Sequence, residues 1–510
     1  MKKFNTLYEI LKFPIKLLFV GYFLLGISTL LMSDNFAIFY TITNQYILGL
    51  LGLFYEIGIF IVVNFPLIIV IKLVSRKTNS YVPILSAIVG YGVYLTTTMI
   101  FADTSLPAYA YSNIMNINDV YSNAASGLIV TKYPIQSGLI AALIVGFATR
   151  ASYKQSRKNQ FTLFNFIDKD ILAIIYNICF CIFFGFIISI LWPLMFDNLV
   201  IFMEFIAEDI SNPMNLFLYG VTDKVLSILG MSEIIREPFW NGVMGGSWLT
   251  ISGENVVGDV NVYNAMINQG IYPTGFGRLI SPYYVLNMFV FPAIILAFTT
   301  VISNKMKMLK ILPTAIFAIL LSIFTGSLLP IEVTLLFLAP LLLFTHILFT
   351  GAIFSILQLF NANLGFSYTG SSATALPGTL FDFAIHLRNP DVSQILFDIF
   401  IIGVVFFIVY YFVVIFYFRY LAIDMFQTGE VRKLIGILGD AIGGYHNIYE
   451  TEASPFRLIV KVKDPTLVDR NALFDIGTDR ITETSDTFTF MLGKKSIIFN
   501  RYLKNILKNR

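Results

Sequence analysis

Cysteine is scarce in this sequence of 510 residues, where only Cys179 and Cys181 occur. The two lie in one apolar run, and side chains two positions apart do not face each other on a helix. The pair therefore supports neither a disulfide framework nor a thiolate metal site. We predict no metal ion and no cofactor for this chain.

Charge is also scarce, because Asp, Glu, Lys and Arg make up only 13% of the residues and the formal net charge is +3. So small a basic excess in a chain of this length is not the electrostatic footprint of a nucleic-acid-binding protein. We therefore expect no nucleic-acid partner, and the charges are informative only through their positions.

Apolar residues are abundant instead, at 57% of the sequence. Apolar stretches of about 18 residues or more recur, which is long enough to cross a hydrocarbon core of ~30 Å as a helix. The pattern predicts an α-helical polytopic membrane protein surrounded by membrane lipid. We expect about ten spans, at residues 15–32, 46–72, 81–101, 134–150, 171–196, 205–230, 283–304, 311–325, 333–359 and 395–424.

The amino-terminal stretch MKKFNTLYEILKFPIK lacks a small-residue cleavage site after its apolar run, so we interpret it as the start of an uncleaved first helix. Basic residues gather in four segments, which the positive-inside rule places in the cytoplasm together with the N-terminus. These residues are Lys2, Lys3, Lys12 and Lys16, then Lys72, Arg76 and Lys77, then Arg150, Lys154, Arg157 and Lys158, and finally Lys305, Lys307 and Lys310.

Residues 205–230 conflict with this orientation, because a full crossing there would place the last basic segment outside. Their sequence contains EFIAEDISNPMNLFLYG, in which acids, Asn and Pro213 interrupt the apolar run. An interfacial or re-entrant course is the alternative. Ten spans would leave the C-terminus on the cytoplasmic side, and nine would leave it outside.

Three further stretches do not fit a simple bundle. Residues 231–282 are long, polar and rich in glycine, residues 326–332 (GSLLPIE) place Gly, Pro and a carboxylate at membrane depth, and residues 361–389 are rich in small and hydroxyl side chains. Irregular backbone at that depth is tolerated where protein or a water-filled cavity covers it. The stretches indicate a permeation pathway, and ordinary extramembrane loops are the alternative for 231–282 and 361–389.

The composition changes after residue 425, where charges of both signs are interspersed. The pattern predicts an amphipathic helix (VRKLIGILGDAI), a turn (GGYHN), a strand (FRLIVKVK), a helix (DPTLVDRNALFDI), a strand (TFTFML) and a basic helix (KKSIIFNRYLKNIL). We therefore expect a membrane domain at 1–425 and a small cytoplasmic α/β domain at 426–510.

Three groups of motifs stand out along the chain. They are GGYHNI followed by VKDPTLVD from Gly443 to Asp469, then WP, LYG and GMSEIIREPFW from Trp192 to Trp240, and GSLLPIEVTLLFLAPLLLFTHILFTG from Gly326 to Gly351. Through these motifs and its order of domains, the chain resembles the enzyme IICB group of the bacterial phosphotransferase system (PTS), in its glucose/maltose/N-acetylglucosamine superfamily.

The resemblance implies a IIC domain that carries a sugar across the membrane. It also implies a IIB domain that receives a phosphoryl group on a cysteine from a IIA protein and passes it to the sugar. A thiolate suits this role, because an alkyl hydroxyl is a far poorer nucleophile and leaving group.

The sequence departs from the family pattern where this chemistry should occur. The cysteine position in EASPFRLI is Ser454, beside a retained Arg457. In the membrane domain the two histidines of the family motif GLHH fall on Ser232 and Glu233, and the first carboxylate of ITEPIE falls on Leu329. Coupled phosphorylation by this chain is therefore doubtful from its sequence.

Two candidate residues belong to the C-terminal domain. Ser454 is a candidate phosphoryl acceptor by position, with a polar residue opening a strand as the simpler interpretation. Arg457 is either an anion-binding residue or a solvated strand charge.

The substrate-binding candidates are Glu332, Glu233, Ser232, His346 and Pro330. An ionisable group such as Glu332 at membrane depth is costly and by default functional, with pairing to exposed backbone N–H as the alternative. Glu233 would contact a polar substrate or pair with Arg236 three positions later. The side chain of His346 is either a proton relay or a buried hydrogen-bonded group.

The leading hypothesis is a homodimeric PTS-type permease for a hexose-class sugar, with a IIA protein as a further partner. Phosphoryl transfer to the sugar would be defective or would occur only through another protein's IIB domain. A sugar sensor that signals through its C-terminal domain, and a facilitator that moves a small polar solute without phosphorylation, are the rival hypotheses.

Overall fold

The structure is a computed structural model. It describes residues 2–38, 40–75, 80–102, 106–112, 114–115, 117–122, 129–158, 167–302, 305–366, 375–418, 428–454, 456–476, 478, 480–493 and 496–508. The basic residues Arg76 and Lys77 and the domain boundary expected at 425/426 lie outside these ranges. The chain packs as two compact units, one formed by Met1–Phe291 and Leu320–Phe406 and the other by Pro292–Ile319 and Phe407–Arg510.

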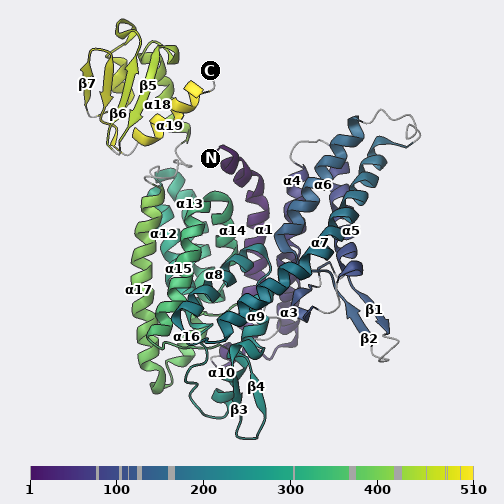
Figure 1. Cartoon of the computed structure of the whole chain (residues 1–510). Coiled ribbons are helices and arrows are strands. Elements are labelled where there is room, and N and C mark those ends of the chain that lie inside the picture. The colour runs from purple at the N-terminus through teal and green to yellow at the C-terminus, as the bar shows by residue number, and fades with distance from the viewer. Residues whose placement is uncertain are drawn as a thin grey trace. The chain divides into compact units, whose positions relative to one another are not determined.

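Long apolar helices dominate the described residues, as Figure 1 shows. Eight of these helices are long and apolar enough to cross a membrane, which makes the chain a multi-pass membrane protein. They are Leu11–Met32, Gln45–Val63, Val82–Phe101, Lys169–Ala207, Ser281–Val301, Met308–Thr325, Pro340–Leu359 and Pro390–Phe416, and the shorter apolar helices are Phe65–Val74 and Leu329–Leu338.

The helices of the first unit pack mainly in pairs, α5 along α7, α1 along α3 and α8 along α15. Their bounds are α1 Lys2–Met32, α2 Asp34–Ala37, α3 Gln45–Val63, α4 Phe65–Val74, α5 Val82–Phe101, α6 Gly138–Lys158, α7 Lys169–Ala207, α8 Pro213–Leu229, α9 Glu233–Trp240, α10 Asp259–Asn268, α11 Ser281–Val285, α14 Leu329–Leu338, α15 Pro340–Leu359 and α16 Leu380–His386. A π-helical turn at Leu286–Val290 leads into α12 (Phe291–Val301), and α12, α13 (Lys305–Thr325) and α17 (Ser393–Phe416) each belong partly to both units.

Prolines break two spans that we expected to be continuous. Residues 46–72 form α3 and α4, separated at Asn64, because Pro66 lacks an N–H and clashes with the preceding turn. Residues 333–359 form α14 and α15, separated at Ala339, whose backbone is non-helical immediately before Pro340.

The expected span at 205–230 is also wrong as a single element. Helix α7 continues from the preceding span to Ala207, and α8 begins afresh at Pro213. The side chain of Asn212 caps α8 by accepting a hydrogen bond from the Met214 N–H at 2.9 Å.

Short elements occupy the irregular stretch at 231–282. Helix α9 is followed by an antiparallel hairpin of β3 (Ser247–Leu249) and β4 (Asn255–Val257), and then by α10. A second small hairpin pairs β1 (Asp119–Ser122) with β2 (Ile129–Lys132) in front of α6. In the stretch at 361–389, residues 367–374 lie outside the described ranges.

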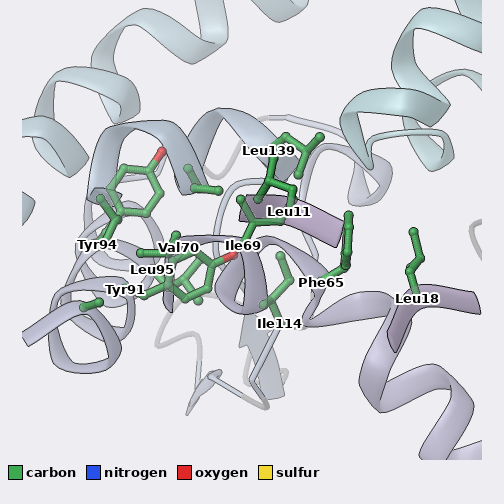
Figure 2. Packing of buried hydrophobic residues seen from close by; sticks show 14 of the residues in the cluster. Leu11, Leu18, Phe65, Ile69, Val70, Tyr91, Tyr94, Leu95, Ile114 and Leu139 are labelled. Atoms are coloured by element: carbon green, nitrogen blue, oxygen red, sulfur yellow. The ribbon is translucent and has the colours of Figure 1, made fainter. Parts of the chain in front are cut away.

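One apolar core joins α1, α4, α5 and α6, and Figure 2 shows its residues from close by. Tyr91, Tyr94 and Leu95 of α5 pack with Ile69 and Val70 of α4, and each of these five side chains is almost fully buried. This core packs helices α1, α4 and α5 against α6, which follows the β1–β2 hairpin.

The C-terminal module forms a four-stranded antiparallel sheet in the order β5–β6–β8–β7, with α19 packed on β5 and β6. Leu458, Val460, Phe488 and Phe490 form its buried centre. Its elements are α18 Thr428–Ala441, β5 Ile448–Ala453, β6 Leu458–Val462, β7 Ile481–Thr484, β8 Thr487–Phe490 and α19 Ser496–Lys508.

Three details of that module correct the sequence-based expectation. The helix expected at DPTLVDRNALFDI is absent from the described residues, where two short 3₁₀ turns stand at Pro465–Leu467 and Ala472–Ile476 instead. Strands β5 and β7 were not expected, because their exposed faces carry polar residues with little alternation. Ser454 consequently lies in the turn between β5 and β6 rather than in front of the first strand.

Helix α6 begins in a tight position that a glycine permits. Gly138 has φ of +45°, and a Cβ built there would lie 2.0 Å from the carbonyl oxygen of Leu229 at the end of α8. The start of α6 is therefore in direct backbone contact with the end of α8.

We predict that Gly138→Ala lowers the free energy of unfolding by more than about 1 kcal/mol, because the new Cβ both clashes and disfavours the positive φ. Gly146→Ala in the same helix is the control, since its Cβ would meet a single atom at 4.0 Å. Thermal unfolding of the detergent-solubilised protein measures both variants, and equal melting temperatures would refute this account of the contact.

Candidate functional site

The first unit contains a cavity of about 700 Å³. Residues from α1, α3, α4, α8, α9 and α14 line it, together with the segments before α6 and after residue 374. Three of the predicted substrate-binding residues, Ser232, Glu233 and Glu332, lie in its wall, although they are about a hundred positions apart in sequence. The structure therefore brings most of the predicted set into one place.

A buried ion pair forms one part of the cavity wall. Lys224 of α8 donates a hydrogen bond from Nζ to Oε1 of Glu332 at 2.8 Å, and both side chains are 1% exposed. Pro330 lies within the first turn of α14 and is buried, which leaves Glu332 near the helix N-terminus, where a carboxylate is favourably placed.

His346 lies behind this pair rather than among the residues that line the cavity. Its Nε2 is 3.4 Å from Oε1 of Glu332, and its ring also packs against Phe291. His346 is fully buried and lies within hydrogen-bonding distance of the Glu332 carboxylate.

A second buried ion pair lies beside the first. Arg236 of α9 donates from Nε to Oδ1 of Asp223 at 2.8 Å, and its Nη2 donates to Ser227 at 3.1 Å and to the hydroxyl of Tyr283 at 3.0 Å. The Tyr283 hydroxyl donates in turn to Asp223. Asp223, which α8 places within reach, is therefore a partner of Arg236 that the sequence did not predict.

Tyr283 joins the two pairs. The Lys224 ammonium lies 5.1 Å from the centre of its ring, and the Arg236 guanidinium lies 5.4 Å from it. Two cations and two carboxylates thus form one cluster whose formal charges cancel. Such a cluster presents fixed donors and acceptors to a cavity without an excess of either charge, which suits an uncharged polar ligand.

The sequence reasoning missed Asp223, Lys224 and Tyr283. The signal was present, because Asp223 and Lys224 stand side by side in the apolar helix PMNLFLYGVTDKVLSIL, where charged residues are costly unless paired. The partners of these charges lie on other helices, so the sequence of this segment does not reveal them.

Leu329 also lines the cavity, at the position where the family motif carries a carboxylate. Ala375, Leu376 and Pro377 complete part of the same wall, while the adjoining residues 367–374 lie outside the described part of the chain. In the described residues no group of three or more His, Cys, Asp or Glu side chains could hold a metal ion.

The C-terminal candidates lie in the other compact unit. Ser454 is half-buried, and its backbone N–H donates to the carbonyl of Arg457 at 2.9 Å to close the β5–β6 turn. Arg457 is exposed.

No family model matches the chain. A search of curated proteins finds the PTS system glucose-specific EIICBA component of Staphylococcus saprophyticus, which is 26% identical over 517 aligned residues. The alignment covers 98% of this chain and 72% of the relative. This similarity over almost the whole chain supports the assignment of the chain to the IICB superfamily of the phosphotransferase system. Ser454, Leu329, Ser232 and Glu233 stand at the positions where the chain departs from the motifs of that superfamily.

We predict that Lys224→Met lowers the free energy of unfolding by about 3–5 kcal/mol, because it leaves the Glu332 carboxylate buried without its cation. Combining it with Glu332→Gln should restore much of the loss, since no buried charge then remains unpaired. A thermal-shift series on the purified protein measures the single and double variants.

Lys461→Met is the matched control, because Lys461 pairs with Glu450 at the same 2.8 Å but in an exposed position. Its effect should be small, as exposed ion pairs contribute little. The interpretation fails if the double variant loses as much free energy of unfolding as the single variants Lys224→Met and Glu332→Gln lose together.

Proposed function

We propose that this protein is a IICB-type permease that moves a hexose-class sugar across the cell membrane. The observation that carries the proposal is the charge-balanced cluster of Lys224, Glu332, Arg236 and Asp223 at a cavity of about 700 Å³, in a chain of which 98% aligns with a glucose-specific PTS component. Sites for small polar molecules combine an apolar wall with a few convergent polar groups of this kind.

In this proposal Glu332 accepts hydrogen bonds from sugar hydroxyls. The hydrogen bond from Lys224 and the nearby His346 ring hold its carboxylate in one orientation. Ser232 and Glu233 face the same ligand from the start of α9, and Pro330 positions Glu332 in the first turn of α14.

Phosphorylation of the sugar by this chain's own C-terminal domain is not part of the proposal. A serine hydroxyl at position 454 is a poor phosphoryl carrier compared with a thiolate, and Leu329 supplies no carboxylate to the cavity. A IIB domain of another protein would act in trans, after accepting its phosphoryl group from a IIA protein.

Topology and assembly complete the proposal. Ten spans with re-entrant segments require two crossings beyond the eight long apolar helices, for which α4, α6, α8 and α14 are the candidates. The basic segments favour cytoplasmic N- and C-termini, with the membrane domain at 1–425 and the IIB-like domain at 426–510. We further propose a homodimer embedded in membrane lipid.

One alternative is a facilitator that releases its sugar unmodified. The observation in its favour is Leu329, an apolar side chain in the cavity wall at the position where the family motif carries a carboxylate. This alternative shares the binding site and differs only in the fate of the sugar.

We predict that the purified full-length protein binds at least one of glucose, maltose and N-acetylglucosamine, and that vesicles containing it take up the same sugar. Glu332→Gln should weaken binding about tenfold or more, because a charged acceptor is lost. Isothermal titration and uptake of radiolabelled sugar are the measurements. Binding without uptake would favour the sensor hypothesis, and the absence of binding to all three sugars would exclude the proposal.

We predict that the wild-type protein acquires no phosphate on residue 454 when incubated with the upstream PTS phosphoryl donors. Ser454→Cys should acquire a thiol-type phosphate label, because a thiolate is restored beside Arg457. Radiolabelled donor and mass spectrometry of the C-terminal peptides measure both. Sugar phosphate formed by the wild-type protein with no other IIB present would contradict this assignment.

A further inference from the structure

One side chain in the cavity wall has an unused hydrogen-bond acceptor. Gln136 is 4% exposed and lines the cavity, and its Oε1 atom has no hydrogen-bond partner. Among the described residues that line the cavity, its side chain is the one with a buried polar atom left without a partner. Such an atom costs free energy unless a donor reaches it.

The backbone around Gln136 is held on both sides. Its N–H donates to the carbonyl of Ala110 at 3.0 Å, and the preceding Ile135 forms an antiparallel bridge with Tyr111. The following Ser137 accepts a hydrogen bond from the Tyr94 hydroxyl at 3.3 Å. The side chain is therefore presented from a supported segment rather than from a loose loop.

The same segment lies close to the other polar groups of the cavity. Gly138 contacts the Leu229 carbonyl at the end of α8, and α9 packs against the turn at Ala108–Ala110 that accepts the Gln136 N–H. Helix α9 carries Glu233 and Arg236. Gln136 thus belongs to the wall that also contains the start of α9.

The chemistry of the unused atom limits what it can bind. An amide oxygen is an acceptor only, so it requires a donor such as a hydroxyl, whereas a carboxylate or phosphate group of a ligand offers only acceptors at neutral pH. We propose that Oε1 of Gln136 accepts a hydrogen bond from a hydroxyl of the bound sugar and thereby favours neutral sugars over sugar acids and sugar phosphates. This inference rests on the proposed function and adds a specificity-determining residue to it.

The first experiment compares Gln136→Leu, which removes the acceptor at similar size, with Gln136→Glu, which keeps an oxygen acceptor. Titration of the purified full-length variants with glucose, maltose and N-acetylglucosamine should show about a five- to tenfold weaker affinity for Gln136→Leu. Gln136→Glu should stay within about threefold of the wild-type protein.

Gln358→Leu is the matched control, because Gln358 of α15 is 8% exposed, also has an unpartnered Oε1 and lies outside the cavity wall. Its affinity should equal that of the wild-type protein. If the two leucine variants lose affinity equally, or if Gln136→Leu binds as the wild-type protein does, the inference is overturned. A wild-type protein that binds none of the three sugars instead overturns the proposed function.

A second measurement uses the wild-type protein and therefore does not depend on the folding of a variant. In a series of deoxyfluoro analogues of the bound sugar, each fluorine removes one hydroxyl donor. At least one analogue should bind the wild-type protein about five- to tenfold more weakly than the parent sugar does. Equal affinity for every analogue overturns the inference.

Discussion

Compensation of charge inside an apolar protein is the constraint on which the candidate site depends. An isolated ammonium or carboxylate in the first unit would be strongly unfavourable, so each must have a partner in the folded chain. The pairs Lys224–Glu332 and Arg236–Asp223 meet this requirement with helices α8, α9 and α14. The four side chains fix how these three helices meet, and the same arrangement supplies the polar groups of the cavity.

The breaks in the apolar helices make this arrangement possible. The start of α14 at Leu329, with Pro330 next, places the Glu332 carboxylate in the first turn, and the interruption before Pro340 ends this short helix at Leu338. The break at Asn64 likewise brings Phe65 and Pro66 to the cavity wall. Short helices and irregular backbone therefore stand where polar groups must face a ligand.

The fold of the C-terminal module does not depend on the side chain at position 454. Leu458, Val460 and Phe488 form a well-buried sheet core, which requires nothing from that side chain. Ser454 occupies a hairpin turn closed by a backbone hydrogen bond, and any residue type except proline can supply that bond. The sheet therefore tolerates a hydroxyl at the position where the family motif carries a thiol.

Local pattern in the sequence determined the apolar spans, the helices α18 and α19 and the strands β6 and β8. These features were predictable because hydrophobic periodicity and the positions of proline act over a few residues. The motif positions of Glu332, Glu233 and Ser232 came from the family resemblance instead. The partner of Lys224 lies 108 positions away, and the unused acceptor of Gln136 exists only because packing leaves no donor near it. Only the tertiary structure decided these pairings, since the energy of a buried polar group depends on which distant side chains surround it.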